Sequence, residues 1–242
     1  MTHEIIRIEL PDNPWGPTAA LIEREDGGPI RPIATGRRHR PVGCYYSFKC
    51  GQAFPWESRT ELLGIYHAEV RFDVVEYKTQ PHTLEMFHEG KKAHYTPDLE
   101  HRLSNGKTEI VEIKAEFDAL VDPNYTIKLA IARDVYAAAG QSFRVIERKE
   151  LEAQPRFKAI EEIQNYRRTA ITAADMFLVS NLFKAKEDVT LGDMKGAYGN
   201  TIVGMAKTYA MMVRRIVEID ITCGLDDRSP VHLPSPSEMT NA

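Results

Sequence analysis

The segment from residue 95 to residue 114 constrains the fold of this chain more than any other. It reads YTPDLEHRLSNGKTEIVEIK, in which Asn105-Gly106 separates two segments without the helical spacing of apolar residues. Short segments of this kind bounded by turn residues are typical of strands, and Asn-Gly is a strong hairpin signal. The sequence therefore predicts an antiparallel hairpin with strands over residues 95–103 and 109–115.

Three ionisable residues of this hairpin have a spacing that suits phosphodiester hydrolysis. Glu112 and Lys114 project from the same face because side chains alternate along a strand, and Asp98 lies near the start of the preceding strand. Carboxylates are the ligands that hard divalent cations prefer, and such a cation generates hydroxide and neutralises the phosphoryl oxygen. A neighbouring ammonium orients the attacking water or stabilises the developing charge. The pattern predicts metal-dependent hydrolysis, with Asp98 and Glu112 as metal ligands.

The length of the turn decides whether Asp98 reaches that face. A three-residue turn over residues 104–106, with Gly106 in the left-handed conformation, places Asp98 opposite Glu112. A two-residue turn places Asp98 opposite Ile113, on the other face, unless a bulge intervenes. The predicted chemistry therefore requires the three-residue turn.

The segments around the hairpin predict a mixed α/β domain. Apolar residues at helical spacing predict a helix that begins near Pro55 and is capped by Ser58 or Glu57. Further strands are predicted over residues 70–77, 82–87 and 143–148, and a second helix over residues 125–140. This order predicts a restriction-endonuclease-like fold, with a mixed sheet flanked by helices, over residues 51–168.

The two ends of the chain differ from this domain. Residues 1–50 are rich in proline, glycine and arginine, which predicts an irregular arm whose Arg37, Arg38 and Arg40 can touch phosphates. Helices are predicted near residues 155–168, 170–183, 190–198 and 201–216, followed by a hairpin of residues 217–221 with 231–233. The interpretation is a mainly helical, winged-helix-like domain over residues 169–233 and a disordered tail over residues 234–242.

Charge and composition limit the partners. The formal net charge of −4 gives no overall attraction for double-stranded DNA, so DNA contacts require local basic residues. Candidates besides the arm are Lys128, Lys207, Arg214 and Arg215, although the last three lie on a methionine-rich helix that suits the core or partner docking at least as well. No run of about 18 apolar residues occurs, and the three cysteines form no even framework, so we expect a cytoplasmic protein with no membrane contact.

Histidine and cysteine side chains offer weaker candidates for metal ligands. Cys44 and Cys50 lie near each other in the sequence, but no second ligand pair follows at a spacing typical of zinc sites. Five histidines surround the hairpin motif in the sequence: His67, His82, His88, His94 and His101. Histidines on the surface of strands are commoner than ligands, so none is assigned a role.

Several short motifs together resemble one family. Residues 57–61 (ESRTE), Gln80-Pro81, residues 95–98 (YTPD) and residues 112–114 (EIK) are similar to the N-terminal domain of TnsA, a PD-(D/E)xK endonuclease, and the resemblance covers residues 46–148. It implies catalytic roles for four residues, of which the first three bind Mg²⁺, or Mn²⁺ in its place: Glu61, Asp98, Glu112 and Lys114. Glu57, one helical turn before Glu61, remains the alternative helix ligand.

The resemblance also implies a role in DNA transposition. TnsA-like proteins cut the 5′ ends of a transposon, while a TnsB-like transposase cuts and joins the 3′ ends and a TnsC-like ATPase regulates both. The expected setting is the bacterial cytoplasm, with transposon-end DNA and these two proteins as partners. Two alternatives stay open: a stand-alone nuclease in defence or repair, and a DNA-binding adaptor whose metal site is inactive.

Overall fold

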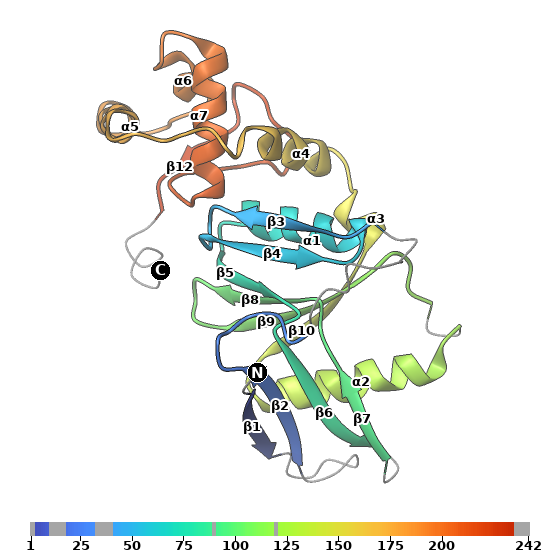
Figure 1. Cartoon of the computed structure of the whole chain (residues 1–242). Coiled ribbons are helices and arrows are strands. Elements are labelled where there is room, and N and C mark those ends of the chain that lie inside the picture. The colour runs from blue at the N-terminus through green and yellow to red at the C-terminus, as the bar shows by residue number, and fades with distance from the viewer. Residues whose placement is uncertain (1–2, 10–17, 32–40, 89–90, 119–120, 235–242) are drawn as a thin grey trace. The chain divides into compact units, whose positions relative to one another are not determined.

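A computed structural model of the chain describes residues 3–9, 18–31, 41–88, 91–118 and 121–234 (Figure 1). The chain forms two compact units. Unit 1 comprises Met1–Tyr46, Ala53–Ile65 and Val74–Glu150, and unit 2 comprises Ser47–Gln52, Tyr66–Asp73 and Leu151–Ala242. Helix α1 (Arg59–Val70) therefore contributes its first part to unit 1 and its last part to unit 2. The division after Glu150 lies earlier than the expected domain boundary at residue 168.

A mixed four-stranded sheet forms the centre of unit 1. Its order is β10 (Ser142–Glu147), β9 (Thr108–Lys114), β8 (Leu99–Leu103) and β5 (Val74–Thr79). Strand β10 is parallel to β9, and the other pairs are antiparallel. Helix α3 (Arg148–Leu151) follows β10 directly. The mixed sheet agrees with the predicted α/β fold class.

Helices lie close to both faces of this sheet. On one face α1 approaches closely, since a Cβ added at Gly64 would lie 2.1 Å from Ile113 Cδ1 of β9. On the other face Ile110 of β9 belongs to a core that includes Leu129 and Val135 of α2 (Pro123–Ala138). Alternate residues of β9 are therefore buried against different helices, as the period of two predicts.

A second sheet includes two strands from residues 1–50, where an irregular arm was predicted. The strand order of this sheet is β1 (His3–Glu9), β2 (Thr18–Arg24), β6 (His82–His88) and β7 (Lys91–Tyr95), and each strand is antiparallel to its neighbours. A two-stranded ribbon of β3 (Gly43–Ser47) and β4 (Gln52–Trp56) follows. Gly27 and Gly28, two of the residues that indicated irregular structure, lie between β2 and β3, and Gly27 has φ +67°. Of the tail predicted over residues 234–242, residues 235–242 lie outside the described residues.

Proline explains two further differences from the predicted elements. The single strand predicted over residues 95–103 is divided, because β7 ends at Tyr95 in one sheet and β8 begins at Leu99 in the other. Pro97 lies between them, and proline has no N–H to continue a strand ladder. Pro55 lies in strand β4 rather than at the start of the helix, which begins at Arg59.

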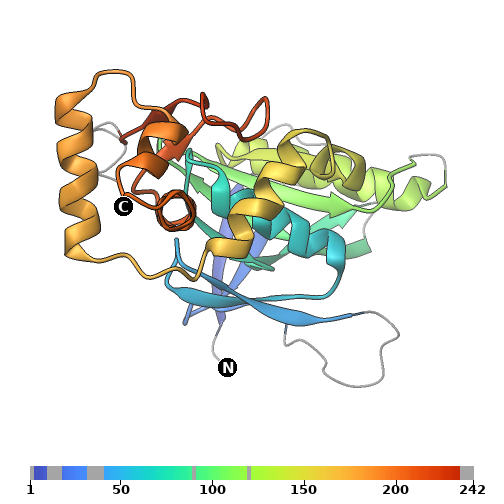
Figure 2. The ribbon, with the colours of Figure 1, turned by 90° about the horizontal axis from the view of Figure 1, so that it is seen from above.

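Unit 2 is mainly helical, as predicted. Its helices are α4 (Arg156–Tyr166), α5 (Ala173–Ala185), α6 (Leu191–Gly196) and α7 (Thr201–Val213), followed by the antiparallel pair β11 (Glu218–Ile219) and β12 (Val231–His232). Capping boxes formed by Thr172 with Asp175 and by Thr190 with Asp193 start α5 and α6. Figure 2 shows α5 at the edge of the unit, and Phe177 on this helix is 70% exposed.

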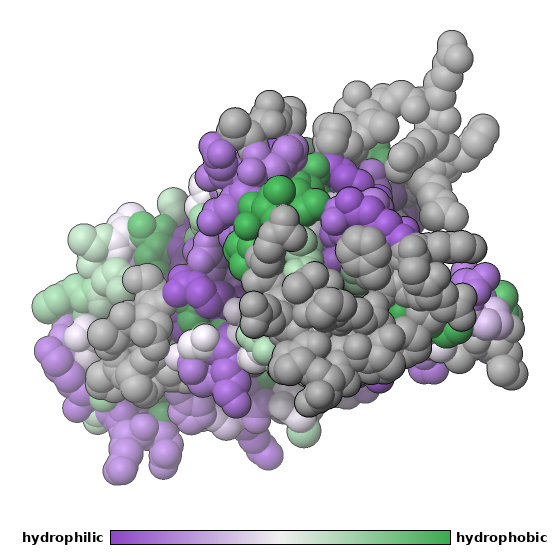
Figure 3. Space-filling view, turned by 90° about the horizontal axis from the view of Figure 1, so that it is seen from below, coloured by the Kyte–Doolittle hydropathy of each residue, from purple (hydrophilic) through white to green (hydrophobic). Residues whose placement is uncertain are grey.

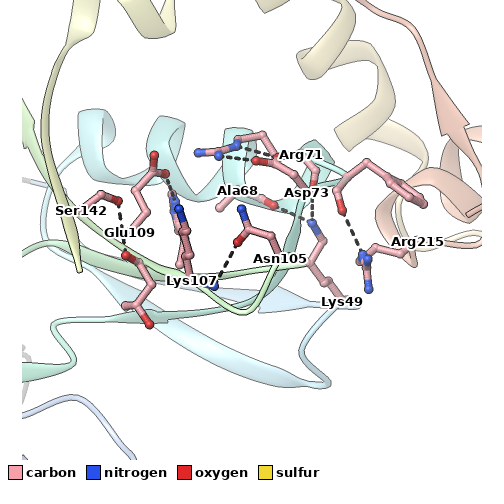
Figure 4. A network of polar contacts seen from close by, with 12 residues as sticks. Lys49, Ala68, Arg71, Asp73, Asn105, Lys107, Glu109, Ser142 and Arg215 are labelled. Carbon is pink, nitrogen blue, oxygen red and sulfur yellow. Dashed lines mark hydrogen bonds and ion pairs between the residues drawn. The ribbon is translucent and has the colours of Figure 1, made fainter. Parts of the chain in front are cut away.

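The last turn of α1 is fixed by a buried lysine. Lys49 Nζ donates hydrogen bonds to the carbonyl oxygens of Ala68 at 2.7 Å and Arg71 at 2.6 Å (Figure 4). Carbonyls at the end of a helix lack partners within it, so a cation at this end is favourable. Burial lowers the pKa of Lys49 to about 7, although the charge of Glu69 opposes the shift.

His67, also on α1, is expected to make the folded state of unit 2 less stable at acidic pH. Its Nε2 lies 2.8 Å from the Leu151 carbonyl oxygen, and burial lowers its pKa to about 4. Between the usual value of about 6.5 and about 4, the unfolded chain binds more protons than the folded chain, so stability is lost as the pH falls through this window. Denaturant titrations at pH 7 and pH 5 measure how much of the free energy of unfolding is lost on acidification. This loss should be smaller for His67→Gln than for wild type, by up to about 1.4 kcal/mol for each pH unit. Exposed His94→Gln is the control, and an equal loss in all three proteins would contradict the assignment.

The sequence contains no run of about 18 apolar residues, so no membrane-spanning helix was expected. None of the helices in the described part of the chain is long and apolar enough to cross a membrane. Ile5 and Ile6, adjacent residues on strand β1, are 58% and 41% exposed. Seen from below, hydrophobic side chains lie in groups interspersed with hydrophilic ones (Figure 3).

Candidate active site

The hairpin of β8 and β9 has the three-residue turn that the predicted chemistry requires. Leu103 N–H donates to the Lys107 carbonyl oxygen at 2.8 Å, and Gly106 has φ +78°. The Asn105 side chain accepts a hydrogen bond from Lys107 N–H at 3.0 Å, which fixes the turn (Figure 4). The register pairs Leu99 with Val111, so the next residue outward, Asp98, faces Glu112 across the strands. This prediction of the turn and register is confirmed.

Two carboxylates and one ammonium meet at the open end of this hairpin. Glu112 is 4% exposed, and its Oε1 lies 2.6 Å from Lys114 Nζ on the same face of β9. Asp98 lies between the end of β7 and the start of β8, and its Oδ2 accepts a hydrogen bond from Ile113 N–H at 2.7 Å. A backbone donor holds one oxygen of Asp98, and the strand holds Glu112, so both carboxylates have fixed orientations.

Two tyrosines hold Glu112 in place. Tyr95 OH, from the end of β7, donates to Glu112 Oε2 at 2.6 Å, and Tyr125 OH, from the first turn of α2, donates to Glu112 Oε1. Lys114 Nζ also lies 4.4 Å from the centre of the Tyr125 ring. Burial and the Glu112 charge raise the pKa of both phenols, so both stay protonated and donate. Sequence reasoning missed the role of Tyr125.

The electrostatics of the site favour a bound cation. Burial and then the charge of Glu112 raise the pKa of Asp98 well above its usual range, although the Ile113 hydrogen bond opposes the shift. Burial raises the pKa of Glu61, and the Glu112 charge adds to the shift. These carboxylates destabilise one another's charged forms, and a hard divalent cation would neutralise that charge. The oxygen donor set of Glu61, Asp98 and Glu112 therefore fits Mg²⁺ or Mn²⁺.

The structure distinguishes the two helix glutamates by their contacts. Ser58 Oγ accepts a hydrogen bond from Glu61 N–H at 3.1 Å, which confirms the predicted cap of α1. Glu61 Oε2 accepts a hydrogen bond from Glu57 N–H at 2.8 Å, and the Glu61 charge contributes to the raised pKa of Asp98. These contacts favour Glu61 as the residue that faces the hairpin carboxylates.

The predicted ligands do not form a preassembled three-atom metal site. Within the described ranges, a different set of three side chains places its ligand atoms within 4.8 Å of one another, as detailed below. The two tyrosines and Lys114 contact both carboxylate oxygens of Glu112, which is one reason why the predicted ligand atoms do not converge on one point. A cation at this site would have to compete with these contacts for Glu112.

The basic residues proposed for DNA contact in unit 2 make internal contacts. Lys207 Nζ lies 2.8 Å from Asp175 Oδ2. The Arg214 guanidinium lies 4.2 Å from the centre of the Phe48 ring, and Arg215 Nε donates to a backbone carbonyl oxygen at 3.2 Å. These groups therefore stabilise unit 2, whatever their further roles.

The remaining basic candidates are less constrained by the structure. Lys128 is half-buried in the second turn of α2. Arg37, Arg38 and Arg40 lie outside the described residues. DNA contact by these four residues therefore stays a prediction.

Comparison with known families identifies the segment that carries the hairpin. Residues 72–148 match the family described as TnsA-like endonuclease N terminal. A comparison with curated proteins gives no match. The matched residues include Asp98, Glu112 and Lys114 but not Glu61, which precedes them. The chain therefore contains a domain of the TnsA-like endonuclease family.

Proposed function

We propose that this protein is a metal-dependent DNA endonuclease that cuts the 5′ ends of a transposon as a subunit of a heteromeric transposase. The observation that carries the proposal is the register that brings Asp98, Glu112 and Lys114 together inside the segment that matches a TnsA-like endonuclease domain. Double-stranded transposon ends are the substrate, and a TnsB-like transposase and a TnsC-like ATPase are the partners. We further propose that α5 to α7 with the β11–β12 hairpin form a winged-helix-like domain for DNA or partner contacts.

The side chains have separate roles in the proposed reaction. Glu61, Asp98 and Glu112 would hold Mg²⁺, which activates the attacking water and neutralises the phosphoryl oxygen. Lys114 donates to the attacking water or to the developing negative charge, since its ammonium lies beside Glu112. Tyr95 and Tyr125 orient Glu112, and the Ile113 N–H orients Asp98. These contacts fix the orientations of Glu112 and Asp98, and a bound cation would replace part of the contacts to Glu112.

Cleavage is expected to require Mg²⁺ or Mn²⁺ and to fail with Ca²⁺. Ca²⁺ accepts more oxygen ligands at longer and more variable distances, so it holds the reacting oxygens poorly for in-line attack. Nicking of a supercoiled plasmid with each cation, at equal ionic strength, measures this dependence. Full activity in the presence of a chelator would reject the metal mechanism.

The position of the cuts separates the proposed role from its alternatives. A plasmid carrying transposon ends is incubated with this protein and with a TnsB-like transposase and a TnsC-like ATPase, and the cut strands are mapped by primer extension. Cuts confined to the 5′ ends, and dependent on the transposase, are the expected result. Partner-independent cutting would indicate a stand-alone nuclease, and unchanged 3′ processing without any 5′ cut would indicate an inactive adaptor.

A further inference from the structure

A second group of potential metal ligands lies in unit 1, outside the hairpin motif. Glu23, His82 and Glu100 each offer one ligand atom, and these atoms all lie within 4.8 Å of one another. Glu23 of β2 is paired with His82 of β6 in the register of one sheet, whereas Glu100 belongs to β8 of the other sheet. Figure 1 shows these three strands. The three side chains therefore converge from two different sheets.

His82 has an orientation that suits a metal ligand. The residue is fully buried, and its Nε2 lies 2.7 Å from Tyr136 OH. In the described part of the chain its Nδ1 makes no hydrogen bond, although Glu100 Oε2 lies 3.5 Å away. A buried polar atom without a hydrogen bond lowers folding stability by about 1–3 kcal/mol. The position of His82 Nδ1 near two carboxylates therefore requires an explanation. Metal-binding histidines usually direct their other ring nitrogen to a hydrogen-bonding group, as Nε2 does here.

We propose that Glu23, His82 and Glu100 bind a Zn²⁺ ion at a site separate from the catalytic one. One imidazole and two carboxylates form a donor set that Zn²⁺ accepts, whereas Mg²⁺ prefers oxygen ligands alone. The ion would link β2 and β6 of one sheet to β8 of the other, and water would complete its coordination. This proposal does not depend on the nuclease activity.

The test is zinc binding by the full-length chain in an Asp98→Asn background, which weakens the proposed catalytic site. Equilibrium dialysis against Zn²⁺ with elemental analysis should give one tightly bound ion per chain. Glu23→Gln and Glu100→Gln in this background should each weaken binding by about tenfold or more. Glu85→Gln is the matched control, because Glu85 also lies on β6 but pairs with Lys92 at 2.6 Å.

Melting temperatures provide the second measurement. Zn²⁺ should raise the melting temperature of the Asp98→Asn chain and of its Glu85→Gln control, but not that of the Glu23→Gln and Glu100→Gln chains. Absence of a stoichiometric ion, or equal binding by all four chains, would overturn the proposal and leave His82 and Glu100 as a simple ion pair. Failure of the nuclease proposal would appear instead as missing cleavage with zinc binding intact.

Discussion

Asp98→Asn is expected to lower metal-dependent cleavage by about a hundredfold or more while leaving the fold at least as stable as wild type. The activity falls because the variant loses a charged metal ligand at the centre of the site. The stability does not fall, because the substituted amide keeps an oxygen that accepts the Ile113 hydrogen bond and removes a buried charge that Glu112 repels. We expect the free energy of unfolding at neutral pH without metal to increase, in the direction set by the raised pKa of Asp98.

Paired measurements of cleavage and thermal unfolding decide this prediction. The sign of the stability change follows from the raised pKa of Asp98, since the folded chain binds the proton more tightly than the unfolded chain. The stabilising effect of the substitution should therefore grow as the pH rises above about 4, where the unfolded carboxyl loses its proton. Wild-type cleavage by Asp98→Asn, or a large loss of stability, would contradict the role given to this residue.

Glu61→Gln should impair cleavage severely, whereas Glu57→Gln should change it little. Glu61 lies in the first turn of α1, whereas Glu57 precedes the helix, which begins at Arg59, so we expect one cation bound by Asp98 and Glu112 to reach only one of them. The Glu61 charge acts on Asp98, and the Glu61 side chain also accepts the Glu57 N–H hydrogen bond. The amide that replaces the Glu61 carboxylate retains an oxygen for that bond, so the helix start should remain intact.

The matched pair provides its own control. Circular dichroism should show equal helix content in the two variants, and the metal concentration for half-maximal cleavage should rise for Glu61→Gln alone. The reverse order of effects would mean that Glu57 is the helix ligand, while the roles of the hairpin residues would still stand.

Local signals in the sequence predicted the central hairpin well. Asn105-Gly106 specified the turn, and the requirement that Asp98 face Glu112 selected the three-residue form that the structure shows. The turn that sets this register is formed by neighbouring residues, so local signals were sufficient to predict it. The helices of unit 2 were predicted for the same reason, because their periodicity and capping residues are local.

Long-range pairing explains what the sequence did not reveal. Strand β2 pairs with β6, which lies far along the chain. No short turn connects the two strands, so no local signal in the sequence indicates that they pair. Tyr125 reaches Glu112 only because α2 packs on the sheet, and the nearest local signal was its place in the first turn after Asp122-Pro123. Lys207 was a candidate for DNA contact in the sequence, whereas the structure places its helix beside Asp175.

Strand cleavage by Lys114→Ala tests the central claim most directly, because this substitution removes the ammonium beside Glu112 and leaves all three proposed metal ligands in place. Single-turnover cutting of transposon ends is measured for wild type, for Lys114→Ala and for the control Lys107→Ala. Lys107 is an exposed residue of the same hairpin. The account predicts a loss of about a hundredfold or more for Lys114→Ala and near-normal cutting for Lys107→Ala. Normal 5′ cutting by Lys114→Ala would contradict it.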